Sequence, residues 1–491
     1  MQLLTESLVL ALAGAALGVV TAVLGVRGFL AWSPVEIPRA AEVNVNGVVL
    51  AFAVGITMLT AVGFGLAPAL VLTRTRMRDA LRRDARADGA AAGGRTRGVM
   101  VTAEIALAVV LLSGAGLLVR SVIEMLRVDA GVDATRVATA DRQLSNTTYG
   151  TWGDVARFYA RLSENLRGNP AIGAAGVSNF LPLEAGWRVP FAYAGSSTEP
   201  GQTPMAQVHS VDEGWQDALG VALREGRGFD VRDDSARPGV VLVNETLVRR
   251  YWPNETVVGK RVDLYTRAIG PLGARLSTQD YEVIGIVRDV RNNTISAVPE
   301  PAIYFTQRQF PFRNMHVYVR GAGSEAALLG VLRDEVRRLD ASIPLAHAQT
   351  LERVLAAPAD PPRLVMTVLL VFSALALLLA AIGIYGILSY LVLNRRREIG
   401  IRMALGARPG EMLSMVLRQG LTLGLAGGAL GVAGAVAASR LLSGLLFGVK
   451  PADPSTLAAV FATTLVVALI ACLIPGRRAA STQPMRALRS E

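Results

Sequence analysis

The residues best placed to do chemistry are charged side chains in residues 395–413, which read RRREIGIRMALGARPGEML between two long apolar segments. Arg395, Glu398 and Arg402 are three and four positions apart, so a helix would place them on one face. Glu398 precedes Arg402 by four residues, which is the favourable order for an ion pair on a helix surface. The spacing predicts a short helix with an ion-paired outer face.

The opposite face of this predicted helix is more apolar, with Ile399, Met403 and Gly406 in one row. Gly406, followed by Pro409 and Gly410, should end the helix and turn the chain into the next segment. We expect a short amphipathic helix that lies flat at a membrane face. The pattern alone leaves two interpretations open: a docking surface, or a positively charged loop that only sets membrane topology.

The sequence lacks a phosphate-binding loop. Such a loop needs glycines whose backbone N–H groups surround the phosphate, then a Lys followed by Ser or Thr. Gly259 and Lys260 are followed by Arg261, and the upstream glycine pattern is missing. We therefore expect this chain not to be an enzyme and to depend on an ATPase in another chain.

Metal, redox and nucleophilic chemistry are not indicated either. The single cysteine, Cys472, excludes an internal disulfide, and its apolar surroundings suggest an inert, buried thiol. The acids, serines and histidines show no nucleophile–base or metal constellation. This includes the three histidines, His209, His316 and His347. We expect no catalytic residue, no cofactor and no bound metal.

Composition indicates a membrane protein. Of the 491 residues, 52% are hydrophobic, and 50 basic residues outnumber 39 acidic ones. The basic residues are mostly arginines at the ends of apolar segments, which membrane topology explains better than nucleic-acid binding. We expect membrane lipid as a partner and no nucleic acid.

Six apolar segments are long enough to cross a bilayer as helices. They are residues 8–32, 48–72, 99–119, 364–393, 415–446 and 457–474. The fourth would be roughly 45 Å long as a helix, against about 30 Å for a hydrocarbon core, so it should tilt or project as a stalk. Apart from Glu104, near one end of its segment, the spans hold almost no ionisable residue, which favours force transmission over a polar transport pathway.

The positive-inside rule orients these segments. Residues 73–97, 394–413 and 476–491 together carry 17 arginines, whereas 33–47 and 447–455 carry one basic residue each. This bias places both termini and the 395–413 connector in the cytoplasm. The large region between the third and fourth segments should then lie outside.

Residues 120–363 have the pattern of a water-exposed mixed α/β domain. Helices are predicted at 154–166 and 324–339, and short strands at 174–178, 240–243, 281–287, 302–306 and 315–319. Two strand–helix–strand units, one near each end, should bracket a more β-rich middle. Four aromatic residues could line a ligand surface or belong to the core: Trp187, Trp215, Tyr251 and Trp252.

The chain repeats itself. LAGAALGV at 12–19 matches LAGGALGV at 425–432, Pro68 corresponds to Pro475, and ALR at 80–82 aligns with ALR at 487–489. The first two spans are therefore a second copy of the last two. Gly14 and Gly18 form a small-residue face that would let another helix approach, or are an incidental match. We expect the chain to be an N-terminally shortened form of a longer duplicated permease.

The order of a span, a large outside domain and three further spans resembles the FtsX/MacB-type ABC transporter permease family. REIGIRMALGA at 397–407 is its most specific motif here, supported by PGRRAA at 475–480 and PMRAL at 484–488. Residues 99–491 cover one complete unit, and residues 1–98 resemble the tail of a preceding unit, as in the duplicated "ADOP" permeases.

The resemblance implies an α-helical membrane protein with six transmembrane helices and a large extracytoplasmic α/β domain resembling the MacB periplasmic core domain. The expected parts are a remnant first unit at 1–98, a stalk helix at 99–126, the core domain at 127–362 and an FtsX-like permease domain at 363–491. The core domain would comprise a porter-like part at 135–205 and 312–352 and an inserted subdomain at 206–311.

The resemblance also implies a function in which 395–413 is a coupling helix resting on a separate ABC ATPase subunit. Long stalk helices would pass nucleotide-driven motion to the periplasmic domain, which is called mechanotransmission. The residues expected at the ATPase contact are Arg397, Glu398, Gly400, Arg402, Ala404, Leu405 and Gly406. The expected location is the inner membrane, with a second permease chain or pseudo-dimer half, and a periplasmic adaptor or hydrolase, as further partners.

Three functional alternatives stay open on the sequence. The first is efflux of antibiotics, peptides or lipoproteins by an ABC transporter. The second is an FtsX-like regulator of cell-wall hydrolases with no transported substrate. The third is a membrane-anchored sensor or scaffold that works without ATP.

Overall fold

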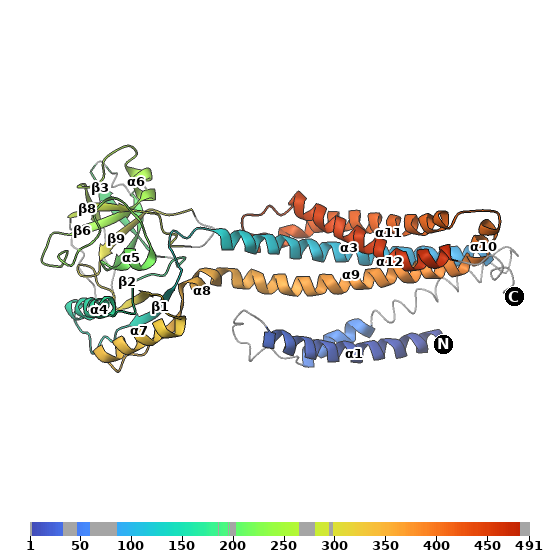
Figure 1. The fold of residues 1–491 in the computed structure, drawn as a ribbon, viewed down its shortest axis with the longest axis horizontal. Helices are drawn as coiled ribbons and strands as arrows, with labels where there is room; N and C mark the ends of the chain where they lie inside the picture. Colours follow the sequence, from blue (N-terminus) through green and yellow to red (C-terminus); the bar gives the residue numbers. More distant parts are fainter. Residues whose placement is uncertain are drawn as a thin grey trace. The chain divides into compact units, whose positions relative to one another are not determined.

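The computed structural model describes residues 2–32, 47–58, 86–184, 186–194, 196, 203–264, 280–293 and 298–481. The chain divides into two compact units, shown in Figure 1. Unit 1 comprises Met1–Ser121 and Pro362–Glu491, and unit 2 comprises Val122–Pro361. Unit 1 is helical, whereas unit 2 is built around a mixed sheet.

Unit 1 is formed by long helices. They are α1 (Gln2–Trp32), α3 (Arg86–Arg127), α9 (Asp360–Asn394), α10 (Arg396–Ala404), α11 (Pro409–Ala438) and α12 (Pro454–Ala480), with the 3₁₀ helix η3 (Ser439–Leu445) after α11. Among the described residues, four helical stretches are long and apolar enough to cross a membrane: Arg97–Arg127, Leu351–Asn394, Pro409–Leu441 and Pro454–Ala480.

The prediction of six spanning helices is therefore supported for four. The first predicted span lies within α1, of which the apolar stretch Leu12–Gly28 is described with its side chains, and the second begins in the apolar helix Gly47–Met58. The rest of the second predicted span, residues 59–72, lies outside the described residues.

Glycines of α11 let two other helices of unit 1 approach closely. A Cβ atom on Gly427 would lie 2.6 Å from Ile105 Cβ, and one on Gly431 would lie 2.5 Å from Val109 Cβ, both on α3. On another face, a Cβ on Gly420 would overlap the sulfur of Cys472 on α12, a residue that is fully buried. Glycine is thus needed along α11 because neighbouring side chains occupy the space of a Cβ.

The repeat gives these glycines counterparts in α1. Gly14 and Gly18 correspond in the alignment to Gly427 and Gly431. Among the described residues, no atom lies within 4 Å of a Cβ added at Gly14 or Gly18. The close helix contact predicted for this face is therefore not made within the described part of the chain.

A polar clamp joins α3 to the start of α12. Arg120 donates to Asp453 Oδ2 and to Ser455 Oγ, each at 2.6 Å. Asp453 is also the N-cap of α12, accepting from Thr456 N at 2.9 Å. Hydrogen bonds from Ser455 and Thr456, with the Arg120 charge, hold the pKa of Asp453 well below its ordinary value, so this cap stays ionised.

The described residues of unit 2 form an 11-stranded sheet. Its strands are β1 (Val137–Gln143), β2 (Ala174–Ser178), β3 (Trp187–Tyr193), β4 (Met205–Val211), β5 (Leu223–Gly226), β6 (Val240–Asn244), β7 (Arg261–Leu264), β8 (Asp280–Val287), β9 (Ala302–Thr306), β10 (Asn314–Arg320) and β11 (Ala346–Thr350). Its helices are α4 (Trp152–Arg167), α5 (Trp215–Leu219), α6 (Glu245–Tyr251), α7 (Glu325–Leu339) and α8 (Leu351–Ala356), with the 3₁₀ helix η2 (Ala357–Ala359) after α8.

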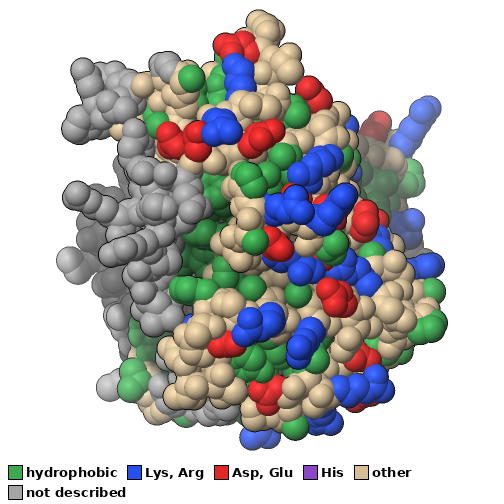
Figure 2. All heavy atoms as spheres, turned by 90° about the vertical axis from the view of Figure 1, so that its left-hand side faces the viewer, with side chains coloured by type: hydrophobic (Ala, Val, Ile, Leu, Met, Phe, Trp, Pro, Cys, Tyr) green, Lys and Arg blue, Asp and Glu red, His purple; other side chains and the backbone are tan. Residues whose placement is uncertain are grey.

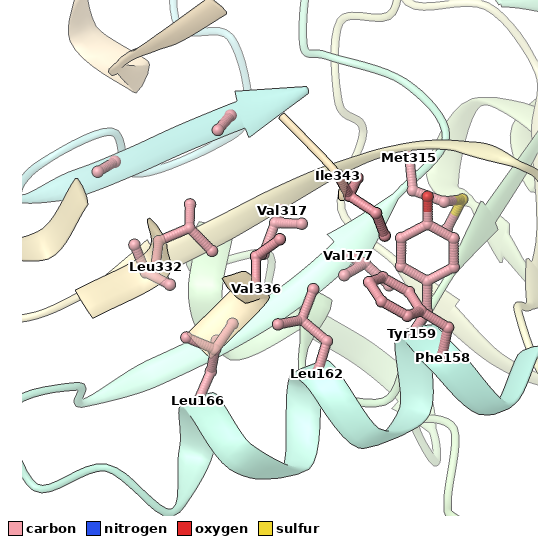
Figure 3. Packing of buried hydrophobic residues seen from close by; sticks show 14 of the residues in the cluster. Phe158, Tyr159, Leu162, Leu166, Val177, Met315, Val317, Leu332, Val336 and Ile343 are labelled. Carbon is pink, nitrogen blue, oxygen red and sulfur yellow. The ribbon is translucent and has the colours of Figure 1, made fainter. Parts of the chain in front are cut away.

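One part of the sheet is four-stranded and antiparallel, in the order β11-β1-β10-β2. In the register of these strands, Val317 of β10 lies opposite Ala140 on β1 and Val177 on β2. Helices α4 and α7 pack against it, and Figure 3 shows Leu162 and Leu332 pointing into the shared apolar core. Thr151 and Ser324 cap the two helices with their side-chain oxygens.

The other part of the sheet closes into a ring. Its strands follow the order β4-β3-β7-β8-β6-β9, and β9 pairs back in parallel with β4. Val208, Phe191 and Phe305 belong to one buried apolar cluster formed by these strands. Closure leaves this part of the sheet without free edges. Strand β3 belongs to the ring although it falls within 135–205, the range expected for the porter-like part.

The strong sequence patterns gave the right elements. The helices expected at 154–166 and 324–339 correspond to α4 and α7, and all five predicted strands are present as β2, β6, β8, β9 and β10. Both strand–helix–strand units are confirmed, as β1-α4-β2 and β10-α7-β11. The predicted elements did not include short strands with little apolar periodicity, such as β5, whose four residues are all exposed.

The surface of unit 2 mixes charges of both signs. Figure 2 shows basic side chains interspersed with acidic ones on one face. Exposed ion pairs include Arg224–Glu245 at 2.9 Å and Arg232–Asp230 at 2.8 Å. Among the side chains described on this face, the basic residues do not form a single-sign surface of the kind that follows a nucleic-acid backbone.

A buried charge network connects α4 with the turn after β4. Arg167 and Arg308 donate to Glu213 Oε1 at 3.1 and 3.0 Å. Asp212 accepts from Val177 N at 2.9 Å, and its other carboxylate oxygen lies 3.6 Å from Arg167. Burial, together with the charge of Glu213, raises the pKa of Asp212 to about 6 although Arg167 opposes the shift.

This network predicts the effect of pH on Asp212→Asn. A carboxyl group whose pKa is raised by folding destabilises the folded state above that pKa, and the penalty disappears as pH falls from about 6 towards 4. The neutral amide of the variant would carry no such penalty, so the variant should be more stable than wild type at neutral pH by on the order of 2 kcal/mol. Thermal unfolding of the full chain, followed by tryptophan fluorescence, measures the difference.

The gain in unfolding temperature should shrink on acidification. The control is Asp217→Asn, which removes an exposed carboxylate of α5 and should behave as wild type at every pH. A difference between Asp212→Asn and wild type that widens as pH falls would contradict the assignment.

Candidate coupling site

The charged connector folds as predicted into a short helix between two long ones. Helix α9 ends at Asn394, α10 runs from Arg396 to Ala404, and α11 begins at Pro409. Arg395 is the N-cap of α10, with a non-helical ψ of 12°, which separates α10 from α9. Pro409 occupies the first turn of α11, where its missing N–H costs no helical hydrogen bond.

The inner face of α10 is anchored in the apolar core of unit 1. Ile399 is only 2% exposed and belongs to the same buried cluster as Val392 of α9 and Val416 of α11. Met403 packs against this cluster, and Gly400 is also buried. Two residues of the predicted apolar row, Ile399 and Met403, therefore fix the helix against α9 and α11, whereas the third, Gly406, is exposed.

The outer face of α10 carries the predicted ion pair beside exposed apolar side chains. Arg402 Nη2 lies 2.6 Å from Glu398 Oε1, and the two side chains are 51% and 47% exposed. Leu405 is 83% exposed and Ile401 is 44% exposed. An exposed i,i+4 pair contributes only about 0.2–0.5 kcal/mol to the stability of a helix. Helix stability alone therefore does not explain why an ion pair and exposed apolar side chains share this face.

Gly406 ends α10 in a Schellman motif. Its φ is 96°, in the left-handed region that glycine adopts without steric cost. Its N–H donates to Met403 O at 3.1 Å, and Ala407 N–H donates to Arg402 O at 3.0 Å, which are the two hydrogen bonds of this motif. No described atom lies within 4 Å of an added Cβ, so backbone conformation rather than crowding requires glycine here.

The seven predicted contact residues do not share one environment. Glu398, Arg402, Ala404, Leu405 and Gly406 are exposed, whereas Gly400 is buried against the helix's own unit. Arg397 lies in α10 by its backbone, but its side chain is outside the described part of the structure. The prediction omitted Ile401, whose exposure follows from its position two residues beyond the buried Ile399.

Aromatic contacts tie neighbouring helices to α9 close to α10. The Arg97 guanidinium of α3 lies 4.7 Å from the ring centre of Tyr390, and Arg478 of α12 donates to the Tyr385 hydroxyl at 3.1 Å. The sequence gave no local sign of either pair, because the partners are far apart along the chain. Both contacts hold the end of α9 from which α10 departs.

Candidate ligand-binding aromatics in unit 2 are mostly core residues. Trp215 and Trp252 are buried, and Tyr251 is partly buried against the core of the ring. Trp187 is 50% exposed, with its ring packed on Phe312.

The histidines of unit 2 have structural partners. Burial lowers the pKa of His209 to about 3, so its ring stays neutral. His316 Nδ1 and His347 Nδ1 lie 2.6 and 2.9 Å from the two oxygens of Asp141. The last two histidines thus converge although their spacing in the sequence does not suggest it. Within the described ranges no group of three or more His, Cys, Asp or Glu side chains could hold a metal ion.

Two family models match the chain. Residues 99–338 match the MacB-like periplasmic core domain, and residues 370–484 match the FtsX-like permease C-terminal model. The first range includes most of unit 2, and the second includes α10, α11, α12 and most of α9. The chain is similar over 76% of its length to the uncharacterized ABC transporter permease YknZ of Bacillus subtilis strain 168, at 23% identity, covering 95% of that protein.

Two further similarities cover smaller parts. The pyoverdine export ATP-binding/permease protein PvdT of Pseudomonas syringae pv. tomato is 39% identical over 122 residues, which are 24% of this chain and 18% of that protein. The crystal structure of the periplasmic region of MacB from Actinobacillus actinomycetemcomitans aligns with 47% of this chain and 95% of its own, at 14% identity and a TM-score of 0.31. Together the two family models cover most of unit 2 and residues 99–121 and 370–484 of unit 1, and the chain belongs to the FtsX/MacB-type ABC transporter permeases.

Proposed function

We propose that this permease is the membrane subunit of an ABC exporter in which a separate ATPase docks on the outer face of α10. The observation that carries the proposal is the pairing of a half-exposed Glu398–Arg402 ion pair with Leu405, which is 83% exposed. An exposed leucine next to fixed charges is suited to a protein interface, where an apolar anchor is surrounded by polar contacts. The hydrocarbon core of a membrane would not suit the charged half of this face.

The transmission part of the proposal rests on how α10 is attached. Ile399 embeds α10 in the core shared by α9 and α11, while α3 packs on the glycines of α11. A displacement of α10 by nucleotide-driven closure of the ATPase would therefore move α9 and α3 together. We propose that these two helices act as stalks that carry the motion to unit 2, which is mechanotransmission.

The proposed topology places both termini in the cytoplasm and unit 2 in the periplasm. The distribution of arginines supports it, because the connector and the C-terminal segment are rich in arginine while residues 447–455 hold only one basic residue. Six spans, with the first two as a second copy of the last two, complete this proposal. Antibiotics, peptides and lipoproteins are the cargo classes, and a second permease chain would complete the transporter.

Labelling of introduced cysteines tests this topology. The native Cys472 is fully buried, so background labelling should be low. A membrane-impermeant thiol reagent added outside intact cells should label Ala236→Cys in unit 2 and not Ser490→Cys in the C-terminal segment. Equal labelling of both positions would refute the topology and the docking proposal with it.

Charge reversal on α10 tests ATPase docking. ATPase activity that copurifies with the tagged full chain should fall at least roughly tenfold in Glu398→Arg and in Arg402→Glu, because like charges would face each other across the interface. The double variant Glu398→Arg/Arg402→Glu restores an ion pair within the helix but exchanges the positions of the negative and positive charges that the ATPase would contact. It should remain defective.

The control for these variants is Arg157→Glu, which reverses one charge of an exposed ion pair on α4, with the two side chains 66% and 35% exposed. It should leave copurified ATPase activity unchanged. Recovery of activity in the double variant would assign the pair a purely structural role. Absence of copurified ATPase from wild type would favour a sensor or scaffold that works without ATP.

Replacing Gly406 should weaken coupling without removing the docking residues. An alanine at φ 96° costs about 1–2 kcal/mol, so Gly406→Ala should unwind the last turn of α10 and displace Leu405. Reconstitution of the permease into lipid should stimulate the bound ATPase less in this variant than in wild type. The turnover number of the ATPase measures the difference. Gly410→Ala, in the regular first turn of α11, is the matched control, and equal loss in both would contradict this role.

A further inference from the structure

The turn that joins α11 to α12, residues 439–453, lies at one edge of the hydrocarbon core of the membrane. Residues 419–438 of α11 carry no charged side chain, and as a helix they extend roughly 30 Å, which matches the thickness of about 30 Å of a hydrocarbon core. Residues 454–476 of α12 are also uncharged and long enough to cross it. Both ends of the turn are therefore ends of membrane-spanning helices.

The turn is more apolar than a loop in water. It reads SRLLSGLLFGVKPAD and contains six large apolar residues: Leu441, Leu442, Leu445, Leu446, Phe447 and Val449. Leu441, in the 3₁₀ helix η3, is 87% exposed. The boundary between lipid headgroups and acyl chains accommodates an exposed leucine, whereas water around it would cost free energy.

Hydrogen bonds hold this turn against α3. Phe447 N–H donates to Ser121 Oγ at 2.8 Å, and Ser121 Oγ donates to Leu445 O at 3.4 Å. Ser121 is fully buried. The clamp between Arg120 and Asp453 fixes the far end of the turn. Leu441 is thus presented on the outside of a turn whose backbone is anchored.

The charged side chains of the turn are suited to phosphate. Arg440 and Lys450 are both exposed. The one acid of the turn is Asp453, which Arg120 already engages at 2.6 Å. Long basic side chains beside apolar ones can lay their stems along acyl chains while their charged ends reach lipid phosphates.

We propose that residues 439–450 form a phospholipid-binding segment at the membrane surface, in which Leu441 inserts at the level of the first acyl carbons and Arg440 and Lys450 bind headgroup phosphate. The segment would hold the ends of α11 and α12 at a fixed depth. The proposal is independent of ATPase docking, because α10 lies at the opposite end of α11.

Fluorescence quenching in vesicles tests the depth of the segment. The full chain carries a thiol-linked fluorophore at Leu441→Cys and is reconstituted into phosphatidylcholine vesicles. Part of the lipid carries a nitroxide, either near the headgroup or at the end of the acyl chain. The nitroxide near the headgroup should quench this fluorophore more than the chain-end nitroxide does.

Two positions calibrate the measurement. Leu430→Cys, near the middle of the uncharged part of α11 and 61% exposed, should be quenched more by the chain-end nitroxide. Ala236→Cys, exposed in unit 2, should be quenched by neither. The chain without an introduced cysteine gives the background from Cys472, which is fully buried. If a second copy of the chain covered Leu441, neither nitroxide would quench there, and that result would overturn the proposal.

The headgroup preference tests the role of the two basic residues. With the nitroxide carried by phosphatidylglycerol instead of phosphatidylcholine, quenching at position 441 should report roughly fivefold tighter binding of the anionic lipid. The preference should disappear in Arg440→Gln/Lys450→Gln and persist in Arg440→Lys/Lys450→Arg, the matched control that keeps both charges. Equal binding of the two lipids by the chain with both basic residues, or an unchanged preference in the glutamine variant, would refute the assignment.

Discussion

The structure of unit 1 depends on glycines of α11, which have no side chain and so let other helices approach closely. Ile105 and Val109 of α3 occupy the space that a Cβ on Gly427 or Gly431 would need, and Cys472 of α12 does the same at Gly420. In lipid, helix association relies on such close packing, because burial of apolar surface gains little when the surroundings are equally apolar. The glycines of α11 therefore determine which helices are neighbours, and the shared core that results also receives Ile399 of α10.

This constraint explains why a nine-residue helix can be a defined surface. An isolated helix of that length is unstable in water because nucleation is costly. Here Ile399 and Met403 attach α10 to the core, while the hydrogen bonds of the Gly406 turn define its end. The outer residues Glu398, Arg402 and Leu405 are consequently held in fixed relation although none of them is buried. A fixed, exposed and chemically mixed face is what a partner protein needs for specific recognition.

The sequence predicted those features that local periodicity and turn chemistry determine. The i,i+4 order of Glu398 and Arg402 predicted their ion pair, and Gly406 with Pro409 predicted where α10 ends. The sequence could not reveal that β9 closes a ring by pairing with β4, because that pairing joins strands about a hundred residues apart. The meeting of His316 and His347 at Asp141 was hidden for the same reason.

The two units place their charged side chains differently, and this difference bears on the proposed function. In unit 1 the described charged contacts gather at helix ends, as with Arg120 and Asp453 or Arg478 and Tyr385, so the apolar midsections can slide or tilt in lipid without moving a charge through it. Unit 2 instead encloses charges, as in the Asp212–Glu213 network between α4 and β4. Buried networks of this kind resist rearrangement because breaking one partner leaves an uncompensated charge. The mechanotransmission that we propose requires both properties: helices that shift in lipid and a head that keeps its internal geometry.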